Sequence, residues 1–217
     1  GVVPISLILS LFIASILNSN IRFKSIFRNI YFLPFVTSTT AIAMAWRWIY
    51  HSQYGLLNYL LGLIGIDSIS WLVDPKWSML ALIILSIWKT LGYNILIILT
   101  GLQNIDKQYY MAAKIDGAKP LKRFYKITLP LLSPTLFFVS ITSLIGAFKV
   151  FGEVYILFEK MPGPLNSCLT MVYYIYDKLA VKYSYGMASA ASVILFLIVL
   201  IITLIQFVIS KKWVHYK

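Results

Sequence analysis

Acidic residues, cysteine and histidine are scarce in this chain of 217 residues. It has 7 Asp and Glu in total, 2 His and 1 Cys. A single cysteine, Cys168, excludes an internal disulfide and a Cys-x-x-Cys metal site. His51 and His215 lie too far apart in the sequence for a histidine-based cluster. No metal site is therefore expected.

Motifs for catalysis and nucleotide binding are also absent. The sequence has no Gly-x4-Gly-Lys-Ser/Thr loop to bind phosphates and no His-Glu-x-x-His helix to hold a catalytic zinc. The aspartates lie in predicted loops or at the ends of apolar segments, which excludes an intramembrane aspartate dyad. We expect no catalytic residue and no cofactor bound by this chain.

Hydrophobic residues, by contrast, are in large excess. They make up 60% of the chain, charged residues make up 12%, and the mean hydropathy is +0.83. Soluble domains average about 45–50% apolar and about 25% charged residues. A soluble core cannot hide such an apolar excess, because a chain of this size still exposes much of its surface. The composition predicts an integral membrane protein.

Apolar stretches of about 20 residues predict membrane-spanning helices. Five stretches qualify and predict an all-α polytopic bundle, with one transmembrane domain over residues 1–217: 2–18, 27–50, 78–102, 131–156 and 186–210. The apolar stretch 55–66 is too short to span, and we expect a helix lying in the membrane interface there.

Basic residues concentrate on alternate connections, although a net charge of +12 is also typical of proteins that bind nucleic acid. Three connections hold 12 of the 19 basic residues: Arg22, Lys24 and Arg28; Lys107, Lys114, Lys119, Lys122, Arg123 and Lys126; and Lys211, Lys212 and Lys217. The positive-inside rule places these connections in the cytoplasm, and the connections at about 51–77 and 157–185 outside. The start of the chain then lies outside, so we expect an upstream sixth spanning helix to be missing. Nucleic acid is not needed to explain the charge.

The cytoplasmic loop at about 103–130 predicts two short helices around a tight corner. Residues 109–115 favour a helix, and Asp116 and Gly117 break it because glycine tolerates positive φ and aspartate forms turns. Pro120 suits the first turn of a second helix. Leu121, Phe124 and Thr128, with Ile127 beside them, give that helix one mostly apolar face. Such an amphipathic hairpin is suited to binding a soluble partner, although a plain connector is the simpler alternative.

The hairpin resembles the "EAA" signature of permease subunits of binding-protein-dependent ABC importers, in which this loop docks into the ATPase subunit. The matching residues are Ala112, Ala113, Asp116, Gly117, Ala118, Phe124, Ile127, Leu129 and Pro130. Met111 stands where the family has Glu. A thioether, able to pack in the docking groove of the ATPase subunit, thus replaces a polar group. The resemblance implies that residues 111–113, 116–118 and 124 couple this chain to the ATPase.

The rest of the chain is similar to the maltose-type oligosaccharide branch of that family, through the runs 32–34, 46–48, 55–58 and 161–164. The resemblance implies partners: a second, different permease subunit, two ATPase subunits that bind ATP and Mg²⁺, and an extracytoplasmic solute-binding protein. It also implies the bacterial inner membrane. The chain would then translocate an oligosaccharide and would not be an enzyme. The open alternatives are a permease subunit for another small solute such as amino acids and, from another class, a stand-alone secondary transporter.

Ionisable residues at bilayer depth are expensive and mark functional sites. Lys89 is predicted near the midplane, on one helix face with Ser86, Thr90 and Tyr93. By resemblance the substrate pathway comprises Ser86, Lys89, Thr90, Tyr93, Phe148, Lys149 and Gly152. Lys149 and Glu153 are alternatively a simple i, i+4 ion pair. Because Lys89 has no partner within its own segment, we also hypothesise an acidic substrate, such as a uronic-acid oligosaccharide.

Overall fold

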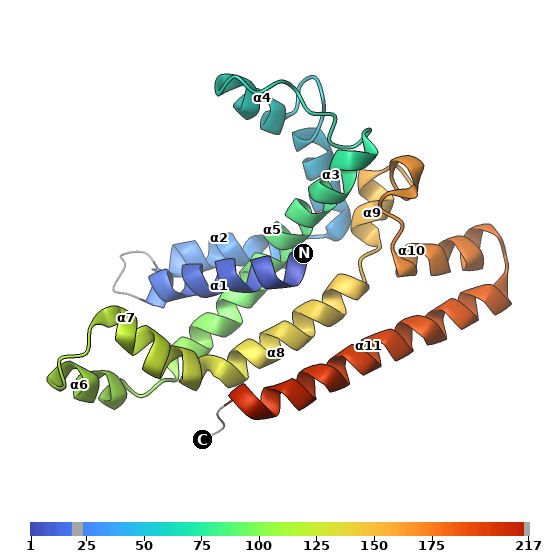
Figure 1. Cartoon of the computed structure of the whole chain (residues 1–217). Coiled ribbons are helices and arrows are strands. Elements are labelled where there is room, and N and C mark those ends of the chain that lie inside the picture. Colours follow the sequence, from blue (N-terminus) through green and yellow to red (C-terminus); the bar gives the residue numbers. More distant parts are fainter. Residues whose placement is uncertain (19–23, 215–217) are drawn as a thin grey trace. The chain divides into compact units, whose positions relative to one another are not determined.

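The computed structural model describes residues 1–18 and 24–214, and every regular element in this part of the chain is helical. Eleven α-helices are present in it: α1 Val2–Asn18, α2 Lys24–Val36, α3 Thr39–Ile49, α4 Leu56–Leu63, α5 Pro75–Gln103, α6 Lys107–Ile115, α7 Pro120–Arg123, α8 Leu129–Phe148, α9 Gly152–Leu157, α10 Met171–Tyr176 and α11 Tyr185–Trp213 (Figure 1). Short π-helical segments follow α7 and α10, at Phe124–Thr128 and Asp177–Val181, and a 3-10 turn covers Pro164–Asn166. Arg22 and Lys217, and the side chains of Lys24, Arg28 and Lys212, lie outside the described residues.

Three continuous helices in the described part are long and apolar enough to cross a bilayer: Pro75–Gln103, Pro120–Phe148 and Tyr185–Lys211. Two of these confirm the predicted spans 78–102 and 186–210. The apolar α1 matches the predicted span 2–18, but at 17 residues it is shorter than the other three. The all-helical class is therefore confirmed, while the count of five spans stays a prediction.

The predicted span 27–50 is not one helix, which corrects the sequence prediction. It is divided into α2 and α3 at residues 37 and 38. Ser38 has the extended backbone of an N-cap, and its carbonyl oxygen accepts the amide of Ile42 at 3.1 Å. Hydroxyl-bearing residues are favoured at helix starts, and the helix boundary falls within the hydroxyl-bearing run Thr37–Thr40.

The predicted span 131–156 is also wrong in its limits. The helix starts earlier, at Pro120, and stops at Phe148, and α9 resumes at Gly152. The break leaves the carbonyl oxygen of Val150 without a helical partner, and the Thr170 hydroxyl donates to it at 2.7 Å. The same hydroxyl accepts the amide of Tyr173 at the start of α10. An irregular backbone is tolerated at membrane depth only with such internal partners.

The helices form two compact units. The first comprises residues 1–2, 36–89 and 145–200, and the second comprises 3–35, 90–144 and the chain from 201 onward. Neither unit is a continuous stretch, and α5, α8 and α11 contribute to both. The chain therefore has no sequential domain boundary, and the single permease domain over 1–217 stays a prediction.

Each unit has its own apolar core. In the first unit, Trp71, Leu85, Val154 and Leu157 are among the buried residues, and in the second unit Ile98 and its neighbours on α5 pack against α1 and α8. Close backbone approach supports the second core. A Cβ atom on Gly92 of α5 would lie 1.9 Å from the carbonyl oxygen of Tyr31 on α2, so only glycine fits there.

The connection between α3 and α5 is organised around one buried polar residue, Asn58 of α4. Its amide nitrogen donates to the carbonyl oxygens of Ser52 and Ile69, both at 2.9 Å, and its amide oxygen accepts the indole N–H of Trp71 and the amide of Ile69. Other α4 side chains are apolar and exposed: Leu56, Tyr59, Leu60 and Leu63. This polar-in, apolar-out arrangement agrees with the predicted interfacial helix.

Candidate functional site

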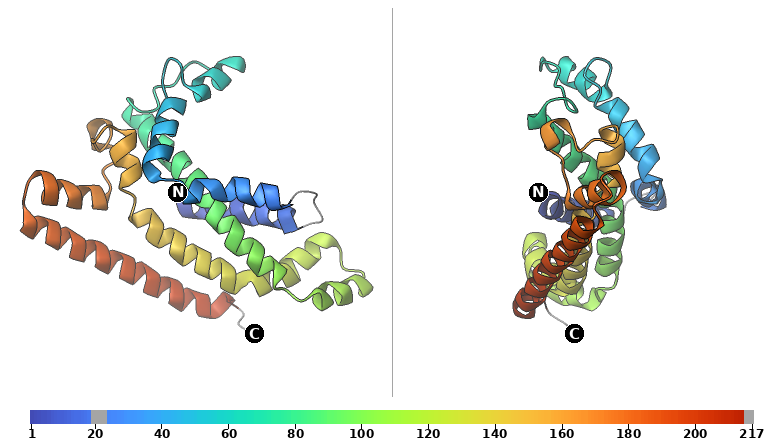
Figure 2. Two further views of the ribbon diagram at one scale, coloured as in Figure 1. Left: turned by 180° about the vertical axis from the view of Figure 1, so that it is seen from behind. Right: turned by 90° about the vertical axis from the view of Figure 1, so that its right-hand side faces the viewer.

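The α6–α7 hairpin of the second unit is the first candidate site, and it confirms the two short helices around a corner. It follows α5 and leads directly into the π-helical segment and α8 (Figure 2). The Asp106 carboxylate caps α6 by accepting the amide of Gln108 at 2.9 Å. At the base of the hairpin the hydroxyls of Tyr110 and Thr128 hydrogen-bond at 2.9 Å, so Thr128 faces inward instead of continuing the predicted apolar face.

The corner of the hairpin has the geometry that the Asp-Gly pair predicts. Gly117 has φ +69°, and its amide donates to the carbonyl oxygen of Lys114 at 3.1 Å. The next amide, of Ala118, donates to the carbonyl oxygen of Ala113 at 2.9 Å. These two bonds form a Schellman motif, in which glycine in the left-handed region closes the helix and satisfies its last carbonyl groups.

The hairpin exposes apolar side chains. The exposed fraction is 87% for Ile115, 69% for Leu121, 60% for Tyr125 and 55% for Met111. Neither α6 nor α7 has a buried residue. Of the predicted coupling residues, Met111, Ala112, Asp116 and Gly117 are exposed, and Ala113, Ala118 and Phe124 are half-buried. Exposed apolar groups of this density mark a surface that another protein or the membrane covers.

Lys89 of α5 is the centre of the second candidate site. Its ammonium group contacts the Glu153 carboxylate of α9 at 2.6 Å and the Thr39 hydroxyl of α3 at 2.7 Å. The exposed fractions of the two charged side chains are 18% and 14%. All three residues belong to the first unit.

The helix breaks bring these three groups together. Thr39 and Glu153 each lie in the first turn of a helix that starts at a break. Gly152 allows the two helix starts to approach, because a Cβ atom there would lie 3.3 Å from the Thr39 methyl group. The partial positive charge of two helix N-termini opposes a lysine, so the Glu153 carboxylate offsets both the ammonium group and these dipoles.

Two sequence-based interpretations of this region are corrected. Glu153 pairs with Lys89 instead of Lys149, because the helix break removes the i, i+4 geometry. Lys149 is exposed at the end of α8. The premise that Lys89 is uncompensated is also corrected, since the Glu153 carboxylate pairs with its ammonium group, while an acidic substrate stays a prediction. Sequence reasoning missed Thr39 and the role of Glu153, although the hydroxyl run and the isolated intramembrane carboxylate were visible signals.

The remaining predicted pathway residues are distributed over both units. Ser86 lies in the first unit, where its hydroxyl donates to the carbonyl oxygen of Leu82 at 2.7 Å. Tyr93 lies in the second unit and stacks on Phe35 with a centroid distance of 4.9 Å. Thr90 also belongs to the second unit, and Phe148 ends α8. Lys89 and Gly152 lie near each other, linked through Thr39 and Glu153, in the first unit, which also contains Ser86, Phe148 and Lys149.

Asn94 of the second unit was not among the predicted site residues. It is 1% exposed, and its amide oxygen accepts the hydroxyl of Ser143 at 3.2 Å. Its amide nitrogen has no hydrogen-bond partner among the described residues. Two polar side chains of α5, Ser86 and Asn94, are thus buried within their own units, as polar groups at membrane depth require.

No metal centre accompanies these sites. Within residues 1–18 and 24–214, no group of three or more His, Cys, Asp or Glu side chains lies close enough to hold an ion. The fold and the two sites define a helical membrane protein with an exposed apolar hairpin and a largely buried charge pair.

The sequence identifies the family. Residues 6–215 match the model for the binding-protein-dependent transport system inner membrane component, and the chain belongs to this family. Its relatives include the probable ABC transporter permease protein YesP of Bacillus subtilis (strain 168), 40% identical over 217 residues that cover 99% of this chain and 70% of the relative. The lactose transport system permease protein LacF of Rhizobium radiobacter is 38% identical and is covered to 72%, with 97% of this chain.

A third relative and two solved structures extend the comparison. The trehalose/maltose transport system permease protein MalF of Thermococcus litoralis is 34% identical, over 96% of this chain and 70% of that protein. The crystal structure of a bacterial ABC transporter that imports the acidic polysaccharide alginate matches with a TM-score of 0.82 and 25% identity, over 97% of this chain and 72% of the other. The crystal structure of a bacterial alginate ABC transporter in complex with an alginate pentasaccharide-bound periplasmic protein also has a TM-score of 0.82. The predicted permease class is confirmed, and such permeases are translocation components and not enzymes.

Proposed function

We propose that this chain is a translocation subunit of an ATP-driven importer for oligosaccharides in a bacterial inner membrane. The observation that carries the proposal is the family match over residues 6–215, together with relatives that are named for lactose, maltose and arabinooligosaccharide transport. An extracytoplasmic binding protein delivers the sugar, as the periplasmic protein of the alginate complex supports. A second, different permease subunit completes the pathway.

The hairpin supports the part of the proposal that concerns the ATPases. Its apolar residues Met111, Ile115 and Leu121 are exposed, and basic side chains flank them at Lys114 and Lys122. A groove on an ATPase subunit would cover these apolar groups. Because the Schellman corner holds α6 rigidly, movement of the groove would pass to α8 through the continuous helix 120–148. ATP and Mg²⁺ bind to the ATPases in this proposal, and this chain binds no cofactor.

The buried charge pair supports a neutral oligosaccharide. Lys89 and Glu153 offset each other, so the pathway has no net charge at this point that would attract a carboxylate. The ammonium group can still donate to sugar hydroxyls and the carboxylate can still accept from them, in competition with their contact to each other. In this proposal Ser86, Thr90, Tyr93, Phe148, Lys149 and Gly152 remain pathway residues, with Thr39 and Glu153 added.

One relative favours a second candidate function. The sn-glycerol-3-phosphate transport system permease protein UgpA of Agrobacterium fabrum is 34% identical, over 98% of this chain and 72% of that protein. A small polyol phosphate is therefore an alternative solute for the same kind of subunit. A comparison of sugar uptake with sn-glycerol-3-phosphate uptake separates the two candidates.

The test is a reconstitution of the complete complex in proteoliposomes with its binding protein. ATP hydrolysis and uptake are measured with lactose, maltotriose, arabinotriose, sn-glycerol-3-phosphate and an alginate oligosaccharide. We expect a neutral oligosaccharide to stimulate both most strongly. Uptake that persists when the ATPase subunits are omitted would overturn the importer proposal. Preferential stimulation by sn-glycerol-3-phosphate or alginate would overturn the neutral oligosaccharide.

A further inference from the structure

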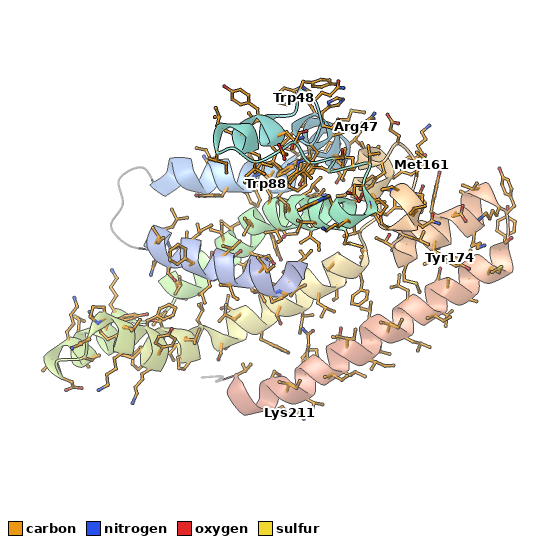
Figure 3. The ribbon with its side chains drawn as sticks, turned by 45° about the horizontal axis from the view of Figure 1, so that its top comes forward. Arg47, Trp48, Trp88, Met161, Tyr174 and Lys211 are labelled. Atoms are coloured by element: carbon orange, nitrogen blue, oxygen red, sulfur yellow. The ribbon has the colours of Figure 1, made fainter. Side chains whose placement is uncertain are left out.

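The first unit contains a cavity of about 470 Å³ that the proposed pathway does not use. It is lined by the end of α3 and the loop after it, by the loop before α5, and by the end of α9 and the loop after it, at connections that are predicted to lie outside the membrane. Arg47 and Met161, labelled in Figure 3, come from two of the segments that enclose it. Its size lies within the range of about 300–1,000 Å³ that is typical of small-molecule sites.

The floor of the cavity is apolar and rigid. Trp71 is 6% exposed, and its ring packs against Tyr50 with a centroid distance of 5.7 Å. The indole N–H of Trp71 donates to the Asn58 amide oxygen at 2.9 Å, and the Tyr50 hydroxyl donates to the carbonyl oxygen of Ala81 at 2.8 Å. Both rings are thereby fixed and almost completely buried, so the apolar surface that a ligand could reach belongs to the exposed lining residues Val73 and Met161.

Polar groups also line the cavity, and the charged pair among them carries no net charge. Arg47 forms an ion pair with Glu159, and the hydroxyl-bearing residues Ser52 and Ser70 line the same cavity. The exposed fractions of the paired side chains are 45% and 58%, so both groups remain accessible to a ligand. A guanidinium group offers several donors and a carboxylate several acceptors in fixed directions. Neighbouring hydroxyls, which both donate and accept, match such a pair.

The loop that supplies Glu159 is held in an unusual backbone conformation. Glu159, Lys160, Leu165 and Asn166 all have positive φ, between 50° and 66°. Such angles are uncommon for residues other than glycine and persist where surrounding contacts enforce them. Here the carbonyl oxygen of Lys160 accepts the Tyr173 hydroxyl at 2.5 Å, and its amide donates to the carbonyl oxygen of Tyr155 at 2.7 Å. These two hydrogen bonds thus hold the strained loop, and with it the Glu159 carboxylate, in place at the cavity.

We propose that this cavity is a carbohydrate subsite for a neutral sugar unit, at which the end of the oligosaccharide first contacts this chain. A sugar ring has an apolar face for the exposed side chains of Val73 and Met161, and hydroxyls for the Arg47–Glu159 pair. A lipid tail has no polar group to bind the remaining donors and acceptors of the Arg47–Glu159 pair. An anionic group would gain little from Arg47, because Glu159 already neutralises its charge. The inference rests on the proposed function, because an importer for oligosaccharides supplies the ligand.

The experiment uses the complete complex in lipid nanodiscs without the binding protein. Saturation-transfer NMR measures direct binding of lactose, maltotriose and arabinotriose to wild type, Ser70→Trp and Ser68→Trp. Ser70 is exposed and lines the cavity, so a tryptophan there fills the space, whereas Ser68 is exposed in the same loop and does not line it. We expect Ser70→Trp to reduce the transfer signal several-fold and Ser68→Trp to leave it unchanged. Equal signals from the two variants, or no signal from wild type with any of the three sugars, would overturn the subsite.

A second variant tests the class of ligand. Glu159→Gln leaves the Arg47 charge uncompensated, so we expect the signal of trigalacturonate to rise several-fold relative to that of maltotriose. A wild-type complex that already prefers trigalacturonate would overturn the neutral class. If Ser70→Trp changes only the amount of loaded binding protein needed for half-maximal ATP hydrolysis, the cavity receives a protein side chain and the proposal is wrong. The proposed function is judged separately, by whether any loaded binding protein stimulates wild-type hydrolysis.

Discussion

Replacement of Glu153 by glutamine tests the buried charge pair most directly. The substitution keeps the shape of the side chain and an acceptor oxygen, but it removes the negative charge 2.6 Å from the Lys89 ammonium group. The lysine then faces two helix N-termini with only the Thr39 hydroxyl and an amide oxygen as partners. Breaking a buried ion pair on one side costs about 3–5 kcal/mol. We expect about 3 kcal/mol here, at the lower end, because both acceptors remain.

The size of this loss can be measured as a change in melting temperature. For a chain of this length, about 3 kcal/mol corresponds to roughly 6–12 °C in Tm. Cys168 is buried in the same unit, so a thiol-reactive dye reports its unfolding in a complex whose other subunits lack cysteine. The double variant Lys89→Met/Glu153→Leu replaces the pair with apolar groups, and we expect it to lie within about 1 kcal/mol of wild type.

The double variant also supplies the control. If the two groups interact as the structure indicates, the double variant loses far less stability than the summed losses of Lys89→Met alone and Glu153→Leu alone. Additive losses would mean that Lys89 and Glu153 act independently. An unchanged Tm in Glu153→Gln would refute the argument that the carboxylate is needed to offset the ammonium group.

Four further changes have expected outcomes. Gly117→Pro should abolish uptake coupled to ATP hydrolysis while leaving membrane insertion intact, since proline cannot adopt φ +69° and lacks the amide of the corner; normal uptake would argue against docking through the hairpin. Asn58→Leu should lower the Tm by removing four hydrogen bonds of the external loop, at about 1–3 kcal/mol for unsatisfied buried partners, and faster proteolysis of that loop would register it. Gly92→Ala should prevent the packing of α2 on α5, because its Cβ atom would lie 1.9 Å from the Tyr31 carbonyl oxygen, and loss of correctly assembled complex on size exclusion would show this. Burial raises the pKa of the Cys168 thiol, so maleimide labelling of the folded complex near pH 8 should be much slower than after denaturation, and equal rates would contradict the burial.

The sequence by itself determined the features that depend on neighbouring residues. Membrane insertion follows from composition, and the hairpin follows from the Asp106 cap, the Asp-Gly corner and Pro120, all of which act within a turn or two of the chain. These interactions are local, so their partners can be read directly along the sequence. The apolar surface of the hairpin was only partly predicted, because Thr128 turns inward to meet Tyr110.

The tertiary structure alone decided the environment of Lys89. Its partner Glu153 lies 64 residues away and Thr39 lies 50 residues away. Both reach it only because the predicted spans 27–50 and 131–156 are broken at Thr37–Ser38 and at residues 149–151. A break inside an apolar stretch depends on partners from elsewhere, such as Thr170 for the Val150 carbonyl oxygen. Hydropathy records how apolar a segment is but not where its backbone finds such partners, and a lysine that looked unpaired in the sequence is therefore paired in the fold.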